Sequence, residues 1–165
     1  MFDCLIVGDS NGVELHFEVM HEDCHLVSKG WMTTERFNRE FPGQFYANTV
    51  IISLGMYDYK GINTEDELHK MRERVGAKNV FWMLPIMNVV GFKIPNYWER
   101  SVPIEKIQKI VKDIAAQYGD TVISTPKNEV TTVGEGASPS NYGLKQIARK
   151  VMEGKAGIEV FPVTP

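Results

Sequence analysis

The chain has 165 residues, of which 43% are hydrophobic and 24% are charged, and this size fits one compact globular domain. Its formal net charge of -3 provides no basic field for a phosphate backbone or an anionic lipid surface, which makes nucleic acids and membranes poor candidates as partners. The first residues carry the acid Asp3 where a signal peptide would carry basic residues, and the first apolar run ends at Gly8. We therefore expect no targeting or membrane-spanning segment.

In chain order, short apolar runs alternate with segments of helical periodicity. The predicted strands cover residues 2–7, 25–28, 49–54, 79–84 and 121–124. The predicted helices cover residues 11–21, 34–41, 65–75, 104–118 and 139–152. Several strands are apolar throughout, which is typical of strands covered on both faces of a parallel sheet.

Local signals mark the ends of two of these helices. Thr64 and Glu67 predict a capping box at the start of the third helix. Gly119 predicts the end of the fourth helix, because glycine adopts the left-handed conformation of a helix C-cap at little cost.

The two cysteines, Cys4 and Cys24, have neither the spacing of metal ligands nor an evident reason to pair. We expect free thiols, which suit a reducing compartment and a cytoplasmic location.

The alternation of strands and helices predicts an α/β fold: a flavodoxin-like three-layer sandwich of about five parallel strands in the order 2-1-3-4-5. A single domain is expected over residues 1–153, with residues 154–165 as a C-terminal tail. Ligands bind such sheets beyond the carboxyl ends of the strands. The segments expected there are residues 8–10, 28–31, 55–58, 85–100 and 125–138.

Two of these segments carry motifs with a chemical meaning. Gly8, Asp9 and Ser10 follow the first strand, and a helix start at Ser10 would place its hydroxyl beside N–H groups that can hold an oxyanion. Gly30 follows the second strand. The alternatives are a helix N-cap for Ser10 and an ordinary turn glycine for Gly30.

Together with two later motifs, these residues resemble the blocks of the SGNH (GDSL-type) hydrolase superfamily. The resemblance implies that Ser10 is the nucleophile and that Gly30 donates its N–H to the oxyanion hole. In the third block, Gly-x-Asn-Asp, the chain has Gly55, Tyr57 and Asp58. Tyr57 replaces the asparagine that donates to the oxyanion, and the loss of such a donor costs roughly 3 kcal/mol of transition-state stabilisation. Asp9 and Asp58 are interpreted as structural groups that bind loop N–H groups.

The last block of the family reads Asp-x-x-His-Pro, and its frame is kept in Pro139, Ser140 and Gly143. This alignment places Glu135 on the aspartate and Ser138 on the histidine. Serine cannot serve as the general base, because its hydroxyl does not titrate near neutral pH. Ser138 and Pro139 also fit the N-cap and first-turn proline of the last helix.

No other residue is an evident base. The histidines are His16, His21, His25 and His69, and the predicted elements place none of them close to Ser10 at the carboxyl edge. Glu135 could act through a water molecule if burial raised its pKa. The sequence has no metal-ligand spacing and no nucleotide-binding glycine motif, so no metal or cofactor is expected.

Two tryptophans on the predicted rim loops, Trp31 and Trp98, are candidates for stacking on a ligand, whereas Trp82 lies in a predicted core strand. The expected partner is a small acyl or carbohydrate-ester ligand or an unidentified protein. The sequence does not indicate the oligomeric state. Small members of this superfamily are common among phage proteins, which implies a phage source and the host cytoplasm.

Three functional hypotheses remain open. The first is an SGNH-like protein that has lost catalysis and binds a ligand or a protein. The second is an atypical serine esterase or acetyl-hydrolase that uses Ser10. The third is an unrelated flavodoxin-like binding module with an accidental Gly-Asp-Ser sequence.

Overall fold

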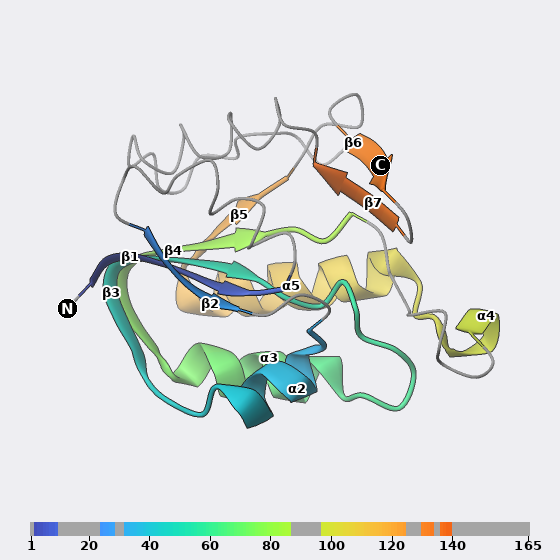
Figure 1. The fold of residues 1–165 in the computed structure, drawn as a ribbon, viewed down its shortest axis with the longest axis horizontal. Helices are drawn as coiled ribbons and strands as arrows, with labels where there is room; N and C mark the ends of the chain where they lie inside the picture. The colour runs from blue at the N-terminus through green and yellow to red at the C-terminus, as the bar shows by residue number, and fades with distance from the viewer. Residues whose placement is uncertain are drawn as a thin grey trace.

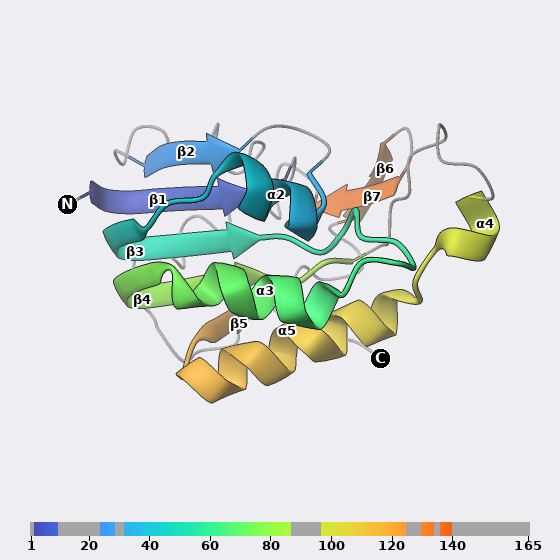
Figure 2. The same cartoon turned by 90° about the horizontal axis from the view of Figure 1, so that it is seen from below.

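The computed structural model describes residues 2–9, 24–28, 32–86, 97–124, 130–133 and 136–139. Its central sheet has five strands in the order β2-β1-β3-β4-β5, and all of their pairings are parallel. The strands are β1 (Phe2–Gly8), β2 (Cys24–Ser28), β3 (Phe45–Ser53), β4 (Val75–Met83) and β5 (Thr121–Ile123). The predicted α/β class and strand order are confirmed. Figure 2 shows the strands running in one direction, so their carboxyl ends share one edge.

Helices α2 (Thr34–Glu40), α3 (Thr64–Glu73) and α5 (Ile104–Tyr118) lie along the same face of this sheet (Figure 1). The short helix α4 (Tyr97–Arg100) lies beyond the carboxyl edge, before α5 in the chain. A second, antiparallel sheet pairs β6 (Val130–Val133) with β7 (Gly136–Pro139). In the part of the chain that the structure describes, no helix is long and apolar enough to cross a membrane.

The core lies between the sheet and these helices. Trp82 on β4 is fully buried there, as predicted, together with Phe37 of α2, Leu68 of α3 and Val111 of α5. The four side chains come from four elements, so burial of their apolar surface holds the helices against the sheet.

Strands β3 and β4 are each nine residues long and begin four residues before their predicted starts. Their added halves pair with each other, with Phe45 opposite Val75 and Ala47 opposite Ala77. These halves contain the polar residues Asn48 and Lys78, which hide the strand pattern in the sequence. Pairing between strands therefore extends them beyond what local propensity indicates.

The predicted end of the fourth helix is confirmed, and the predicted start of the third is wrong. Gly119 has φ 71° and caps α5 by donating its N–H to the carbonyls of Ala115 and Ala116. The N-cap of α3 is Asn63, whose side chain accepts the N–H of Asp66 at 3.1 Å. Thr64 is already inside the helix, and its hydroxyl instead donates to Asp58.

The expectation of free cysteines is also wrong, because Cys4 and Cys24 form a disulfide. The two residues are directly opposed on the parallel strands β1 and β2, with Cα atoms 4.4 Å apart. Neighbouring strands point opposed side chains to the same face of the sheet, which brings the two sulfur atoms together. A sequence separation of 20 residues gives no local sign of this pairing.

The prediction that a helix starts at Pro139 is wrong as well. Ser138 and Pro139 belong to β7, where Ser138 lies opposite Thr131 and Pro139 opposite Val130. They are therefore not the N-cap and first turn of a helix. The remainder of that predicted helix, and the predicted helix over residues 11–21, lie outside the described residues.

Candidate functional site

The first candidate motif begins where β1 closely approaches β3. Gly8 has φ 135°, and a Cβ atom at this position would lie 1.8 Å from the carbonyl oxygen of Ser53. Glycine is therefore required both by the backbone conformation and by the space available. The approach lets Asp9 donate its N–H to the same Ser53 carbonyl at 2.8 Å.

Two serine hydroxyls at the ends of neighbouring strands also form hydrogen bonds that position Asp9. Ser53 donates its hydroxyl to Oδ1 of Asp9 at 2.7 Å, and Ser28 at the end of β2 donates to the carbonyls of Gly8 and Asp9. Asp9 is 1% exposed. The residue that precedes Ser10 is thus held by the ends of three strands, although Ser10 itself lies outside the described residues.

The third motif forms a turn between β3 and α3. Gly55 has φ 108°, and Asp58 donates its N–H to the Gly55 carbonyl at 3.2 Å. A Cβ atom on Gly55 would lie 3.0 Å from Cγ2 of Ile107, so this turn packs closely against α5. Tyr57 is half-buried in the turn.

Asp58 is fully buried and accepts three described hydrogen bonds. The N–H of Thr34 donates to Oδ1 at 2.8 Å, and the hydroxyls of Thr34 and Thr64 donate to Oδ2 at 2.9 Å and 2.7 Å. Burial raises the pKa of the Asp58 carboxyl above its ordinary value of 3.8, although the hydrogen bonds from the two threonines oppose this shift. Asp58 therefore ties the start of α2 to the start of α3.

Threonine residues at the starts of two helices were not among the predicted site residues. Thr34 and Thr64 each occupy the first position of a helix, where local sequence reading assigns them to capping. Their shared acceptor, Asp58, follows Thr34 by 24 residues, so no short motif indicates the connection. The serines that end β2 and β3 could have been identified from the sequence more readily than these threonines. Polar residues at the carboxyl ends of parallel strands lie at the edge of the sheet where ligands bind.

Several predicted site residues lie outside the described residues: Ser10, Gly30, Trp31 and Glu135. Trp98 belongs to α4, and Ser138 belongs to β7. The structure therefore brings Asp9, Gly55, Tyr57 and Asp58 to the carboxyl edge of the central sheet, while convergence of Ser10, Gly30 and Ser138 stays a prediction.

The described histidines lie away from this edge. His25 is exposed near the amino end of β2, where its ring packs on Phe2 with centroids 4.6 Å apart. His69 lies in the middle of α3. Within the described ranges there is also no group of three or more histidine, cysteine, aspartate or glutamate side chains that could hold a metal ion.

The fold of this chain is similar to that of several solved structures, which cover 92% to 93% of it. The chain has the fold of the GDSL-type (SGNH) hydrolases. Similar structures include a Bacteroides fragilis protein assigned as an acylhydrolase, with TM-score 0.62 and 11% identity over 92% of this chain and 85% of that one. A GDSL-like lipase from Bacteroides thetaiotaomicron has TM-score 0.61 and 13% identity over 92% and 86% of the two chains.

An Agrobacterium tumefaciens protein assigned as an arylesterase also matches, with TM-score 0.53 and 15% identity over 93% of this chain and 98% of that one. No protein-family model matches the sequence, and neither does any curated protein. At such low identities the GDSL-type fold is shared, while residue roles depend on the residues of this chain.

Proposed function

We propose that this GDSL-fold protein has lost serine-hydrolase catalysis and binds a small acyl or carbohydrate-ester ligand or a protein partner. The observation that carries the proposal is Ser138 at the position of the family histidine. A serine nucleophile needs a base with a pKa near the working pH, and a second serine cannot supply one.

A second replacement affects a different catalytic function. Tyr57 stands where the family has the asparagine that donates to the oxyanion. A tyrosine hydroxyl extends further from the backbone than an asparagine amide, so a working oxyanion hole would have to be rebuilt around it. Changes to both the base and the oxyanion donor make compensation by one new residue less plausible.

The scaffold beside these replacements is retained. Gly8 and Asp9 are held against Ser53, and Asp58 joins the two threonines, through buried hydrogen bonds. Buried polar groups are costly unless they are paired, so these contacts stabilise the fold independently of any reaction. A retained scaffold with altered catalytic groups is the pattern expected of a binding protein derived from an enzyme.

The cytoplasmic location predicted from the sequence rested in part on the expectation of free cysteines. The Cys4–Cys24 disulfide favours an oxidising compartment instead, because reducing systems keep most cytoplasmic thiols free. A phage source stays a prediction from the family resemblance.

The proposal is tested by assaying purified protein on p-nitrophenyl acetate and p-nitrophenyl butyrate. We expect turnover no faster than that of the Ser10→Ala variant, and no labelling of Ser10 by a fluorophosphonate probe. Turnover that Ser10→Ala abolishes would contradict the proposal and support an atypical esterase.

Restoring the family residues provides a complementary test. The double variant Tyr57→Asn with Ser138→His should hydrolyse p-nitrophenyl acetate faster than the parent, because it returns the oxyanion donor and the base to their family positions. The two single variants are the matched controls. We expect each to remain near the parent rate, since catalytic groups that act together are strongly non-additive.

A further inference from the structure

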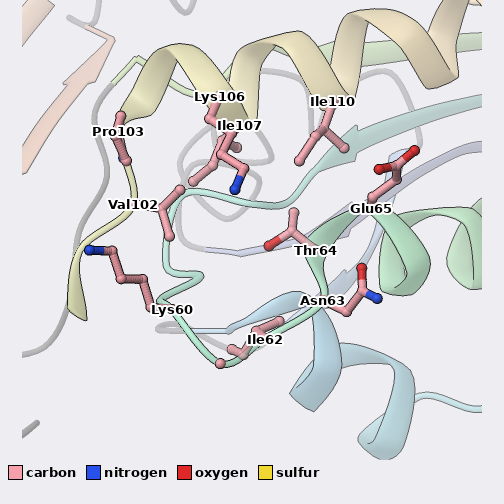
Figure 3. Close-up of a pocket in the computed structure, with 11 residues that line it drawn as sticks. Lys60, Ile62, Asn63, Thr64, Glu65, Val102, Pro103, Lys106, Ile107 and Ile110 are labelled. Carbon is pink, nitrogen blue, oxygen red and sulfur yellow. The ribbon is translucent and has the colours of Figure 1, made fainter.

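A cavity of about 330 Å³ lies between the start of α3 and the start of α5 (Figure 3). Its apolar lining comes from Ile62 in the loop before α3, from Val102 and Pro103 before α5, and from Ile107 and Ile110 of α5. Pockets that bind small molecules begin at about 300 Å³. The cavity therefore has room for a small ligand with an apolar body.

The walls of this cavity are held by contacts between two segments distant in sequence. Tyr59 and Ser101 form a β-bridge, and Lys60 donates its N–H to the carbonyl of Arg100 at 2.8 Å. The guanidinium of Arg100 also lies over the ring of Tyr59, 4.7 Å from its centroid. Because these contacts are made within the protein, the cavity walls are in place before a ligand binds. Binding therefore costs little conformational entropy of the protein.

Two lysines give the cavity a cationic rim. Lys60 and Lys106 line it, and neither has an ion-pair partner among the described residues. Figure 3 places the ammonium nitrogen of Lys106 below α5, on the side of Thr64, whereas the nitrogen of Lys60 points away from Ile62. Lys106 is thus the cation closer to the apolar lining.

The acidic side chain in the described lining is Glu65, and Figure 3 shows its carboxylate pointing away from Val102. The pKa of Lys109 is raised chiefly by its hydrogen bond to Asp113, and the charge of Glu65 also contributes. At the start of α5 the N-cap is Pro103, which makes no side-chain capping bond, so the positive end of this helix also faces the cavity region.

We propose that this cavity binds a small amphipathic monocarboxylate, with the carboxylate at Lys106 and an alkyl body against Ile62, Val102 and Ile110. The apolar lining accounts for the alkyl body, and the ammonium group of Lys106 accounts for the negative charge. The site is separate from the proposed loss of catalysis and does not depend on it, because it uses none of the motif residues of the family.

The probe for this site is octanoate, titrated into ¹⁵N-labelled protein and followed by amide chemical shifts. We expect shifts concentrated in residues 60–65 and 102–110, with a dissociation constant on the order of 1 mM. Octanol and octylammonium are the matched ligands, since they keep the chain and change only the head group. Both should bind more weakly than octanoate.

Lys106→Gln should weaken octanoate binding about fivefold, which is the upper range for one exposed ion pair, and leave octanol binding unchanged. Lys112→Gln is the matched control, because Lys112 lies on the same helix and does not line the cavity. An amide spectrum like that of the parent establishes that each variant is folded. Equal octanoate affinity in the two variants, tighter binding of octylammonium, or shifts located elsewhere would overturn the proposal.

Discussion

At the scale of single residues, Asp58 is the most constrained polar group at the carboxyl edge. It is fully buried and takes hydrogen bonds from the main chain of Thr34 and from the hydroxyls of Thr34 and Thr64. Removing it would leave an N–H and two hydroxyls without their acceptor in a dry environment, which is more costly than the bonds themselves are favourable.

Asp58→Ala should therefore reduce the free energy of unfolding by about 3 kcal/mol. Asp58→Asn should cost less, because the amide oxygen can accept from the Thr34 N–H while the threonine hydroxyls rotate to accept from the amide nitrogen. Urea unfolding of the parent and both variants gives the comparison. Equal losses for alanine and asparagine would show that these hydrogen bonds are not what stabilises the turn.

The raised pKa of Asp58 also predicts a pH dependence of stability. A carboxyl with a higher pKa in the folded than in the unfolded protein binds more protons when folded, so stability falls as pH rises from 3.8 toward the folded pKa. The Asp58→Asn variant should lack this decrease. In unfolding free energies measured from pH 4 upward, the deficit of the variant should be largest at low pH and should shrink as pH rises, because only the parent loses this stability. A constant difference would contradict the assignment to Asp58.

At the scale of elements, helix α5 ends because Gly119 adopts the left-handed conformation. A Cβ atom there would have nothing within 4 Å, so backbone conformation is the whole cost of a substitution. Gly119→Ala should lower stability by about 1 kcal/mol. Gly43→Ala is the matched control, since that position has equal space and no positive φ, and should be neutral or slightly stabilising. Thermal unfolding of both variants tests this difference.

A buried ion pair joins three elements at the amino edge of the sheet. Asp120, just before β5, accepts from Nε and Nη2 of Arg72 at 2.7 Å and 2.9 Å, and from Nε1 of Trp82 at 2.9 Å. Arg72 also stacks over the ring of Tyr118, 4.2 Å from its centroid. The pair thus connects α3, β4 and the end of α5.

Asp120→Ala should reduce stability by about 3 to 5 kcal/mol, because it leaves the buried Arg72 guanidinium without a counter-ion. Asp113→Ala removes an exposed ion pair with Lys109, whose N–O distance of 2.7 Å equals that of the buried pair. This variant should change the free energy of unfolding very little. Denaturant unfolding of the two variants compares a buried with an exposed pair. Similar losses in both would contradict the role of burial.

At the scale of the whole molecule, the disulfide joins edge strand β2 to β1. It closes a segment of 20 residues, and Cys4 and Cys24 are both buried. In the chain-entropy account, a loop of this length corresponds to about 3 kcal/mol of stabilisation. The closed segment includes Ser10. The disulfide therefore also reduces the conformational freedom of the first motif in the unfolded chain.

Reduction after brief unfolding should therefore lower the unfolding temperature of the parent protein. The Cys4→Ala, Cys24→Ala double variant should start lower and be insensitive to reductant, which separates loss of the disulfide from other effects of the reagent. Free thiols are counted in the denatured, unreduced protein. Two titratable thiols there would contradict the disulfide.

Patterns in the sequence were sufficient to predict the order of the five strands and the end of α5. The apolar runs of β1, β3 and β4 and Gly119 act within a few residues, so the signal is local. The motif residues Asp9, Gly55 and Asp58 were also placed at the correct edge, because residues after parallel strands meet there.

The tertiary structure alone decided the Cys4–Cys24 disulfide, the hydroxyl of Thr64 on Asp58, and Ser138 in β7. Each depends on pairing between residues distant in sequence. Local preferences for helix, strand or cap differ by only about 1 kcal/mol, so a buried carboxylate or a neighbouring strand overrides them. The sequence by itself determined the alternation of strands and helices and the end of α5 at Gly119, because those signals lie within a few residues.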